Sequence, residues 1–198
     1  MMSAKARRVS DGETLRSIVG RTTAQLRSGV TDGIVRPAVT TRFIGMQRAQ
    51  SEFVQYDRVF RFQCDESRER GGTGKYPSPM RYFLSSVGFC LQVWYAKGAA
   101  LVGCVMDDVI IAVETELDMR GEHKVAGVPS GPERLAVESY VRSSDASDCV
   151  IRAVQEADER CPVLDVLGRA MTVHERVWVN GALELDRLLG RSVRGHDS

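Results

Sequence analysis

Two of the five cysteines stand where a side chain could carry out thiol chemistry. Cys90 lies in an apolar segment with helical periodicity, and Cys161 comes directly before a proline that ends a second helical pattern. A cysteine attacks as the thiolate, which a neighbouring positive charge or a helix N-terminus favours. Cys90 has neither in its own segment, because Pro79 marks the helix start and Cys90 follows about three turns later. Nucleophilic chemistry at Cys90 therefore requires an arginine from another part of the fold.

A purely structural role is the alternative for both residues. Free cysteine is among the most frequently buried residue types, and periodicity alone favours an inert core side chain at Cys90 and at Cys161. The position of Cys161 at a helix end also suits a resolving thiol presented to a neighbouring element. The remaining cysteines are predicted to be structural: Cys64, Cys104 and Cys149.

Other kinds of catalytic site fit the sequence poorly. No two cysteines have CxxC spacing and the three histidines do not cluster, so we expect no metal site. An odd number of cysteines without an export signal argues against a disulfide framework. The glycine-rich residues 71–74 do not form a phosphate-binding loop, since Lys75 is followed by Tyr76 rather than by serine or threonine. No GxSxG motif of a serine hydrolase is present, and no cofactor is predicted.

The composition is that of a folded domain. The chain has 198 residues, of which 43% are hydrophobic, and its 27 basic residues nearly balance its 26 acidic ones. A chain of this length buries roughly 70% of the surface that it exposes when unfolded, so it needs no disulfides. The longest uncharged stretch, residues 82–96, is too short for a membrane span, and no apolar run follows the first charges. We therefore expect a cytoplasmic protein without a membrane segment.

The positive charge is concentrated in residues 1–42, which carry eight lysines and arginines against three acidic residues. The rest of the chain has a net negative charge. The near-zero net charge of the whole chain disfavours nucleic-acid binding. If the basic arm did bind nucleic acid, its affinity would fall steeply as the salt concentration rises.

The periodicity predicts a helix over residues 13–28 and then a small antiparallel sheet, with Arg48 in the turn between its first two strands. A Gly/Pro loop at residues 71–79 opens the central core helix, which is predicted to be buried around most of its circumference. The strands of the small sheet are predicted at 38–44, 51–56 and 58–64. After the core helix, we expect strands at 109–119, 135–142 and 171–179, a helix at 148–160 capped by Ser147, and a helical turn at 163–168.

This order of elements resembles the OsmC/Ohr family, the osmotically inducible protein C and organic hydroperoxide resistance proteins. The resemblance rests on GGTGKYPSPMRYFLSSVGFC at residues 71–90 and on ADERCPV at residues 157–163. It implies an α+β fold in which antiparallel sheets are wrapped around a long central cysteine-bearing helix in an intertwined homodimer. The expected OsmC-like domain spans 38–180, between a basic N-terminal arm with a possible helix at 1–37 and a polar tail at 181–198.

The resemblance also implies an activity, the thiol-dependent reduction of organic hydroperoxides in oxidative stress defence. Cys90 would be the peroxidatic cysteine and Cys161 the resolving cysteine. A dithiol or lipoyl-type reductant would return both cysteines to thiols. The activating arginine of the family comes from the first hairpin, which points to Arg48, with Arg42 as the weaker match. A guanidinium keeps its charge, so it can favour the thiolate and hold a peroxide oxygen.

One position departs from the family pattern. Where the hydroperoxide reductases have a glutamate that holds the arginine, this chain has Met80, followed by Arg81. Either Asp65 or Glu66 substitutes for it, Arg81 supplies charge near the helix start, or the peroxidase chemistry is weakened. The alternative function is accordingly a non-catalytic OsmC-like dimer that binds a lipophilic small molecule.

Overall fold

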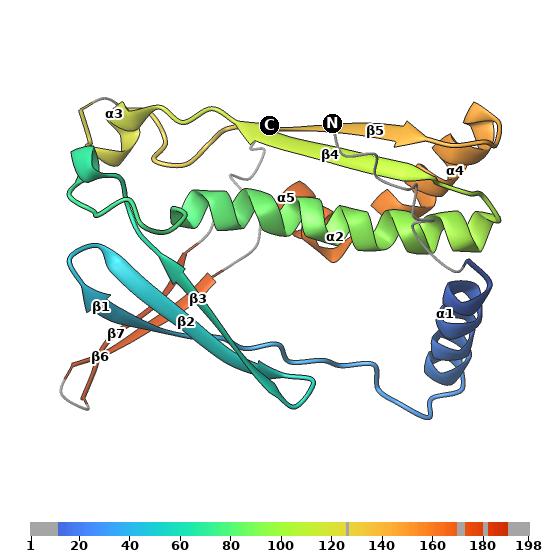
Figure 1. Cartoon of the computed structure of the whole chain (residues 1–198). Helices are drawn as coiled ribbons and strands as arrows, with labels where there is room; N and C mark the ends of the chain where they lie inside the picture. The colour runs from blue at the N-terminus through green and yellow to red at the C-terminus, as the bar shows by residue number, and fades with distance from the viewer. Residues whose placement is uncertain (1–11, 126, 170–172, 180–181, 190–198) are drawn as a thin grey trace, which may run out of the picture.

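The computed structural model describes residues 12–125, 127–169, 173–179 and 182–189, with helix α2 (Pro79–Val102) at its centre (Figure 1). The other elements are helices and antiparallel strands: α1 (Gly12–Arg27), β1 (Thr40–Gly45), β2 (Arg48–Gln55), β3 (Arg58–Cys64), η1 (Arg68–Arg70), β4 (Asp108–Thr115), α3 (Met119–Glu122), β5 (Leu135–Arg142), α4 (Ser147–Asp158), α5 (Pro162–Gly168), β6 (Val173–Val179) and β7 (Ala182–Leu189). The predicted α+β class is confirmed. None of the helices in the described ranges is long and apolar enough to cross a membrane.

Helix α2 begins at the proline that the sequence indicated and ends at a glycine. Pro79 occupies its first turn, where the missing N–H has no helical partner to lose. Gly103 ends it in the left-handed region at φ 83°, and its N–H donates to the carbonyl of Ala99. Val87 and Leu91 are fully buried against the neighbouring elements, and burying each contributes about 1.5–3 kcal/mol. The helix thus forms the core and holds Cys90 in its middle.

The sheet β1–β2–β3 is fastened to the first turns of α2 by aromatic side chains. The ring of Phe53 stacks on those of Phe60 and Phe62, with centroids 5.5 and 5.8 Å apart. Phe62 in turn meets the edge of Tyr82 on α2, whose hydroxyl donates to the carbonyl of Gln63 at 2.7 Å. The aromatic contacts and this hydrogen bond fix the orientation of the sheet on the helix.

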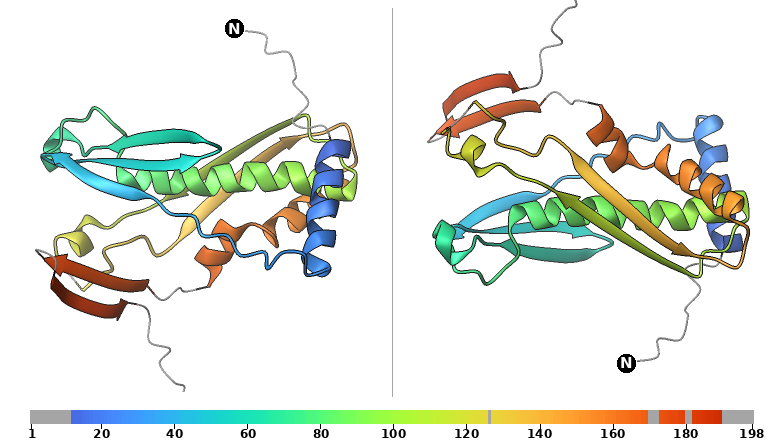
Figure 2. Two further views of the ribbon diagram at one scale, coloured as in Figure 1. Left: turned by 90° about the horizontal axis from the view of Figure 1, so that it is seen from below. Right: turned by 90° about the horizontal axis from the view of Figure 1, so that it is seen from above.

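Helices α2 and α4 pack antiparallel and very closely, as the views from above and below also show (Figure 2). The close approach occurs at Gly98, where a methyl group would clash with the carbonyl oxygen of Ala153 and press on Ala157. Both alanines are fully buried. The small residues on the two helices therefore set the distance between them.

Substitution of Gly98 should destabilise the protein. In Gly98→Ala the added methyl group has no space, and we expect a loss of about 1–3 kcal/mol in the free energy of unfolding, as for other overpacked cores. Gly20→Ala is the matched control, because Gly20 lies in α1 with open space around it, and alanine is favoured there by up to about 1 kcal/mol. Urea unfolding of both variants measures the difference. Equal stability of the two variants would contradict this packing.

The helix at the N-terminal arm, α1, agrees with the predicted range and lies across the C-terminal end of α2 (Figure 2). The guanidinium Nε of Arg16 donates to the carbonyl of Ala100 at 2.6 Å, so it satisfies a group at the C-terminal end of α2. No residue of α1 is buried. The contact with α2 is consequently peripheral, and it combines this hydrogen bond with the half-buried side chains of Leu15 and Val19.

Several local predictions were wrong. Arg48 is the first residue of β2, paired with Gly45, because Met46 adopts a positive φ and makes the hairpin turn tighter than expected. Ala146, not Ser147, is the N-cap of α4, and no side chain caps that end. The predicted polar tail includes β7, where leucines alternate with acidic residues and pair with β6.

The expected burial of α2 around most of its circumference is also not found in the single chain. Phe89 is 72% exposed and Val93 is 53% exposed. Both lie on the face of α2 away from the buried residues Val87 and Leu91. An apolar strip of the central helix is therefore uncovered in one copy of the chain.

Candidate active site

The fold brings together the two cysteines that the sequence singled out. Cys90 lies in the middle of α2, and Cys161 is the N-cap of α5 after the end of α4. The thiol of Cys161 donates a hydrogen bond to the sulfur of Cys90 at 3.2 Å. A disulfide has an S–S distance of about 2.05 Å, so a shift of about 1 Å separates these sulfurs from bonding distance. Cys161 is fully buried and Cys90 is partly exposed, so a reactant from solvent meets Cys90 first.

The surroundings of Cys90 within the chain favour its protonated form. Burial is the main cause of its raised pKa, and the adjacent Cys161 thiol adds to the effect. The backbone N–H of Val163 donates to the Cys90 sulfur, and the positive charge of Lys97 also acts to lower the pKa, but together they are weaker than burial. The described part of one chain thus holds Cys90 ready as a thiol, and an additional positive charge is needed to make a thiolate at neutral pH.

Arg48 is not brought to the cysteines within one chain. Among the residues that the structure describes, no hydrogen bond or ion pair joins Arg48 to Cys90 or Cys161, and its Nε is buried without a hydrogen-bond partner. The neighbouring side chain of Gln47 donates to the carbonyl of Arg70 at 2.6 Å, which places this end of the hairpin beside η1. Arg42, the weaker candidate, is exposed on β1.

The loop before α2 is organised by Asp65, which is buried. Its carboxylate accepts from the N–H and hydroxyl of Thr73, from the N–H of Lys75 and from its own neighbour Glu66. Burial opposes ionisation, yet these hydrogen bonds outweigh it and hold the pKa of Asp65 well below its usual range. Sequence reasoning had considered Asp65 only as a replacement for the missing glutamate, whereas its carboxylate is occupied by this loop.

The other two residues considered in place of the missing glutamate are Glu66 and Arg81. Glu66 forms an ion pair with Arg70 at 3.2 Å, and Arg70 binds Glu122 as well, at 2.6 Å. Arg81 is exposed at the start of α2. Met80 and Arg81 line a cavity of about 430 Å³ between α2 and β4, which does not include Cys90, Cys161 or Arg48.

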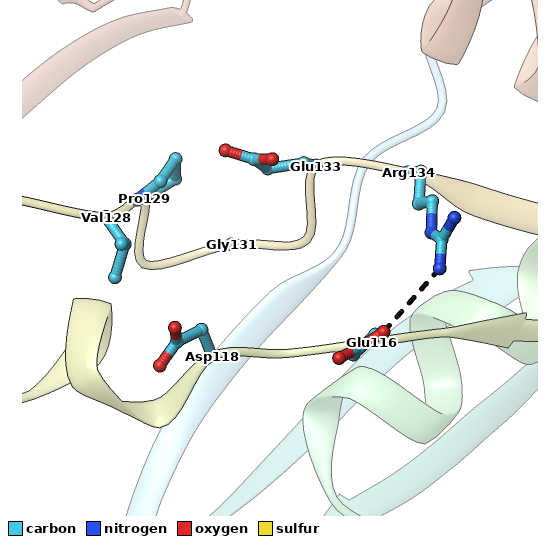
Figure 3. Close-up of a pocket in the computed structure, with 7 residues that line it drawn as sticks. All are labelled: Glu116, Asp118, Val128, Pro129, Gly131, Glu133 and Arg134. Atoms are coloured by element: carbon cyan, nitrogen blue, oxygen red, sulfur yellow. Dashed lines mark ion pairs between the residues drawn. The ribbon is translucent and has the colours of Figure 1, made fainter.

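Two more cavities have no cysteine among their lining residues. Figure 3 shows one of about 400 Å³ between the end of β4 and residues 128–134, where Glu116 pairs with Arg134 at 3.6 Å. Its lining includes the acidic residues Glu116, Asp118 and Glu133, with Asp118 and Glu133 on opposite sides. The second, of about 340 Å³, lies between α2 and β4 and is partly walled by Phe89. None of the three predicted site residues lines either cavity.

Sequence reasoning missed the contribution of Val163. Its backbone N–H reaches Cys90 because Pro162 starts α5 immediately after Cys161, which turns the chain back toward α2. The Cys-Pro dipeptide was the available signal, but it does not tell which element the following N–H groups face. That information exists only once α4 is packed on α2.

Comparisons with known proteins agree with this architecture. The family model described as OsmC-like protein matches residues 72–176. A solved structure of an OsmC-like protein from Mycoplasma pneumoniae is similar with a TM-score of 0.56 at 13% identity, covering 68% of this chain and 88% of that one. A candidate osmotic stress induced and detoxification response protein from Psychrobacter arcticus 273-4 gives a TM-score of 0.52 at 14% identity, covering 67% and 88%. No curated protein matches the chain.

The two structural similarities, at such low identity, concern the fold alone. The family match covers just over half of the chain and includes α2, α4, all but the first residue of the Gly/Pro loop, and both candidate cysteines. It therefore shows that this chain belongs to the OsmC-like protein family.

Proposed function

We propose that the protein reduces organic hydroperoxides with a pair of thiols, Cys90 as the peroxidatic and Cys161 as the resolving cysteine. The observation that carries the proposal is the 3.2 Å separation of the two sulfurs, which come from residues far apart in the sequence. Membership of the OsmC-like family supports the same chemistry. The protein would act in the defence against oxidative stress, in the cytoplasm, where thiols are kept reduced.

The reaction consists of two balanced thiol steps. The Cys90 thiolate attacks the terminal oxygen of the hydroperoxide, the O–O bond breaks, and the alcohol leaves after taking up a proton. Cys90 is then a sulfenic acid. The Cys161 thiol attacks its sulfur, so that a disulfide forms and water is released. A dithiol or lipoyl-type reductant returns both residues to thiols by exchange.

The burial of Cys161 suits its proposed role. Because Cys161 is fully buried, it is protected from direct attack by peroxide, yet it contacts the sulfur with which it must react. Cys90 is the partly exposed member of the pair and is positioned to meet the substrate first. These different exposures support the assignment of the peroxidatic and resolving roles.

The working form is proposed to be a homodimer. In one chain, large apolar side chains are exposed on α2, on the β1–β3 sheet and on the β4–β5 sheet, among them Phe89, Phe43 and Ile110. Apolar side chains exposed together on regular elements are typical of an interaction surface. A second copy that covers it would also supply the positive charge that Cys90 lacks, and Arg48, with its buried and unpartnered Nε, is the proposed source.

A non-catalytic dimer that binds a lipophilic molecule is the second candidate function. It is favoured by the raised pKa of Cys90, caused mainly by burial, and by Met80 in place of the family glutamate. In that case a lipophilic ligand would bind equally well to wild type and to a Cys90→Ser/Cys161→Ser double variant.

Peptide mapping of the oxidised protein tests the proposed function. The reduced protein is treated with one equivalent of cumene hydroperoxide or of hydrogen peroxide, and mass spectrometry locates any new disulfide. We expect a Cys90–Cys161 disulfide that forms faster with the organic peroxide, because apolar side chains surround Cys90. Reduced Cys90 after excess cumene hydroperoxide would overturn the peroxidase proposal and favour the binding function.

A further inference from the structure

A second group of ligand-type side chains lies at the far end of α2 from Cys90. It consists of Cys104, just beyond the helix, Asp145, in the β5–α4 connection, and Cys149, in the first turn of α4. One ligand atom from each residue lies within 4.8 Å of the other two. From this convergence we propose that Cys104, Asp145 and Cys149 bind a thiophilic divalent cation, zinc in the first instance. The site is separate from the proposed peroxidase and does not depend on it.

Backbone hydrogen bonds hold the carboxylate of the group in position. The N–H of Val105 donates to Oδ2 of Asp145 at 2.7 Å. The hydroxyl of Ser143 donates to the carbonyl of Val105 at 2.6 Å and accepts from the N–H of Asp145 at 3.0 Å. This arrangement orients one carboxylate oxygen and leaves lone pairs of the group for a cation, as hydrogen bonds commonly do for metal ligands.

The donor set suits zinc. Two thiolates and one carboxylate are ligand types that zinc accepts, in a tetrahedral arrangement whose fourth position can hold water. With Zn–S bonds of about 2.3 Å, two sulfurs on one tetrahedral ion lie about 3.8 Å apart. The sulfurs of Cys104 and Cys149 lie within 4.8 Å of each other, so their separation needs an adjustment of about 1 Å at most. The three deprotonated ligands carry three negative charges, which a divalent ion largely neutralises.

The exposure of the ligands provides a path for the ion. Cys104 is buried, Cys149 is partly exposed and Asp145 is exposed, so the group opens to solvent on the side of the carboxylate. Sequence analysis expected no metal site and structural roles for both cysteines. It missed the group because Cys104 and Cys149 are distant in sequence and meet only when α4 packs antiparallel on α2.

Metal titration of the full-length reduced protein tests the site. A Cys90→Ser/Cys161→Ser background removes the other thiol pair, which could itself bind a thiophilic ion. We expect this background to bind one equivalent of Co²⁺ with a thiolate-to-cobalt charge-transfer band and tetrahedral ligand-field bands, and Zn²⁺ to displace it. Zn²⁺ should also raise the Tm of the background protein, because it binds only the folded chain tightly.

Substitutions of the ligands distinguish this site from other sulfur groups. In the same background, Cys149→Ser, Cys104→Ser and Asp145→Asn should each weaken Zn²⁺ binding, the cysteine changes at least about 100-fold, since loss of an outer-shell partner alone costs 10–100-fold. Cys64→Ser is the matched control and should bind as the background does, because Cys64 lies at the end of β3 away from the group.

Circular dichroism checks that each variant is folded. Asp145 is exposed and Cys149 is partly exposed, so Asp145→Asn and Cys149→Ser should fold and decide the test even if Cys104→Ser does not. A background protein that binds no Co²⁺ would overturn the proposal. So would unchanged binding in Cys149→Ser and Asp145→Asn, or an equal loss in Cys64→Ser.

Discussion

Replacing Cys90 with serine should lower the turnover of cumene hydroperoxide by at least about 1,000-fold, because the variant has lost its nucleophile. A hydroxyl is nearly isosteric with a thiol, so the fold of α2 should be retained, and no sulfenic acid can form at this position. The measurement is peroxide consumption with dithiothreitol or dihydrolipoate as the reductant. Cys64→Ser, on the β1–β3 sheet, is the control and should keep the wild-type rate. Full activity of Cys90→Ser would refute the two-thiol mechanism.

The companion variant separates the two thiol roles. Cys161→Ser should reduce one equivalent of hydroperoxide at close to the wild-type rate and then accumulate Cys90 as a sulfenic acid, which a dimedone adduct detects. Multiple turnover should fall, since no disulfide forms for the dithiol to reduce. If Cys161→Ser sustained full turnover with a dithiol, the 3.2 Å contact between the two sulfurs would have no resolving function.

The second large effect is expected at Arg48. Arg48→Ala should lower kcat/KM about 100- to 1,000-fold, the usual cost of removing a charge or donor from a reacting oxygen. The physical reason is that burial raises the pKa of Cys90 within one chain, so the thiolate depends on an added positive charge. Without that charge the pKa of Cys90 returns to the raised level that burial imposes in one chain, and the rising limb of the pH–rate profile should move to higher pH. Stopped-flow measurement of peroxide reduction across pH 5–10 records the shift.

The control for this prediction is the other hairpin arginine. Arg42→Ala removes an exposed side chain of β1 and should leave the pH–rate profile unchanged. Arg48→Lys retains the charge but not the planar fork, so it should recover the pH profile more than the rate. If Arg42→Ala shifted the profile and Arg48→Ala did not, the activating residue would be Arg42.

The sequence predicted most of the helices and strands because their periodicity is local. Residues Val87 and Leu91 mark the buried face of α2, and the proline and glycine at its ends define its length. The boundaries that were wrong depend on backbone detail, as at the hairpin turn before Arg48, where Met46 adopts a positive φ. The strand β7 was missed because its charged residues, Glu184, Asp186 and Arg187, are of the kind expected in a polar tail.

The candidate site was predictable only in part. The family resemblance indicated Cys90 and Cys161, but nothing in their spacing along the chain says that their sulfurs meet. That contact depends on the packing of α4 on α2 at Gly98, Ala153 and Ala157. The surroundings of Arg48 were likewise inaccessible to sequence reasoning, because they require the β1–β3 sheet to be placed on the helix. Tertiary packing, rather than local pattern, determines both.

The antiparallel packing of α2 and α4 has a consequence for covalent chemistry. It places Cys90 with Cys161 at the C-terminal end of α4 and Cys104 with Cys149 at its N-terminal end, about 20 Å away at 1.5 Å per helical residue. Sulfurs of different pairs cannot touch while the two helices stay packed. Within one chain, a disulfide that links Cys90 to Cys104 or to Cys149 would therefore form only after the chain has opened. Its presence in a purified or stressed sample would be a lasting chemical record that the molecule had unfolded.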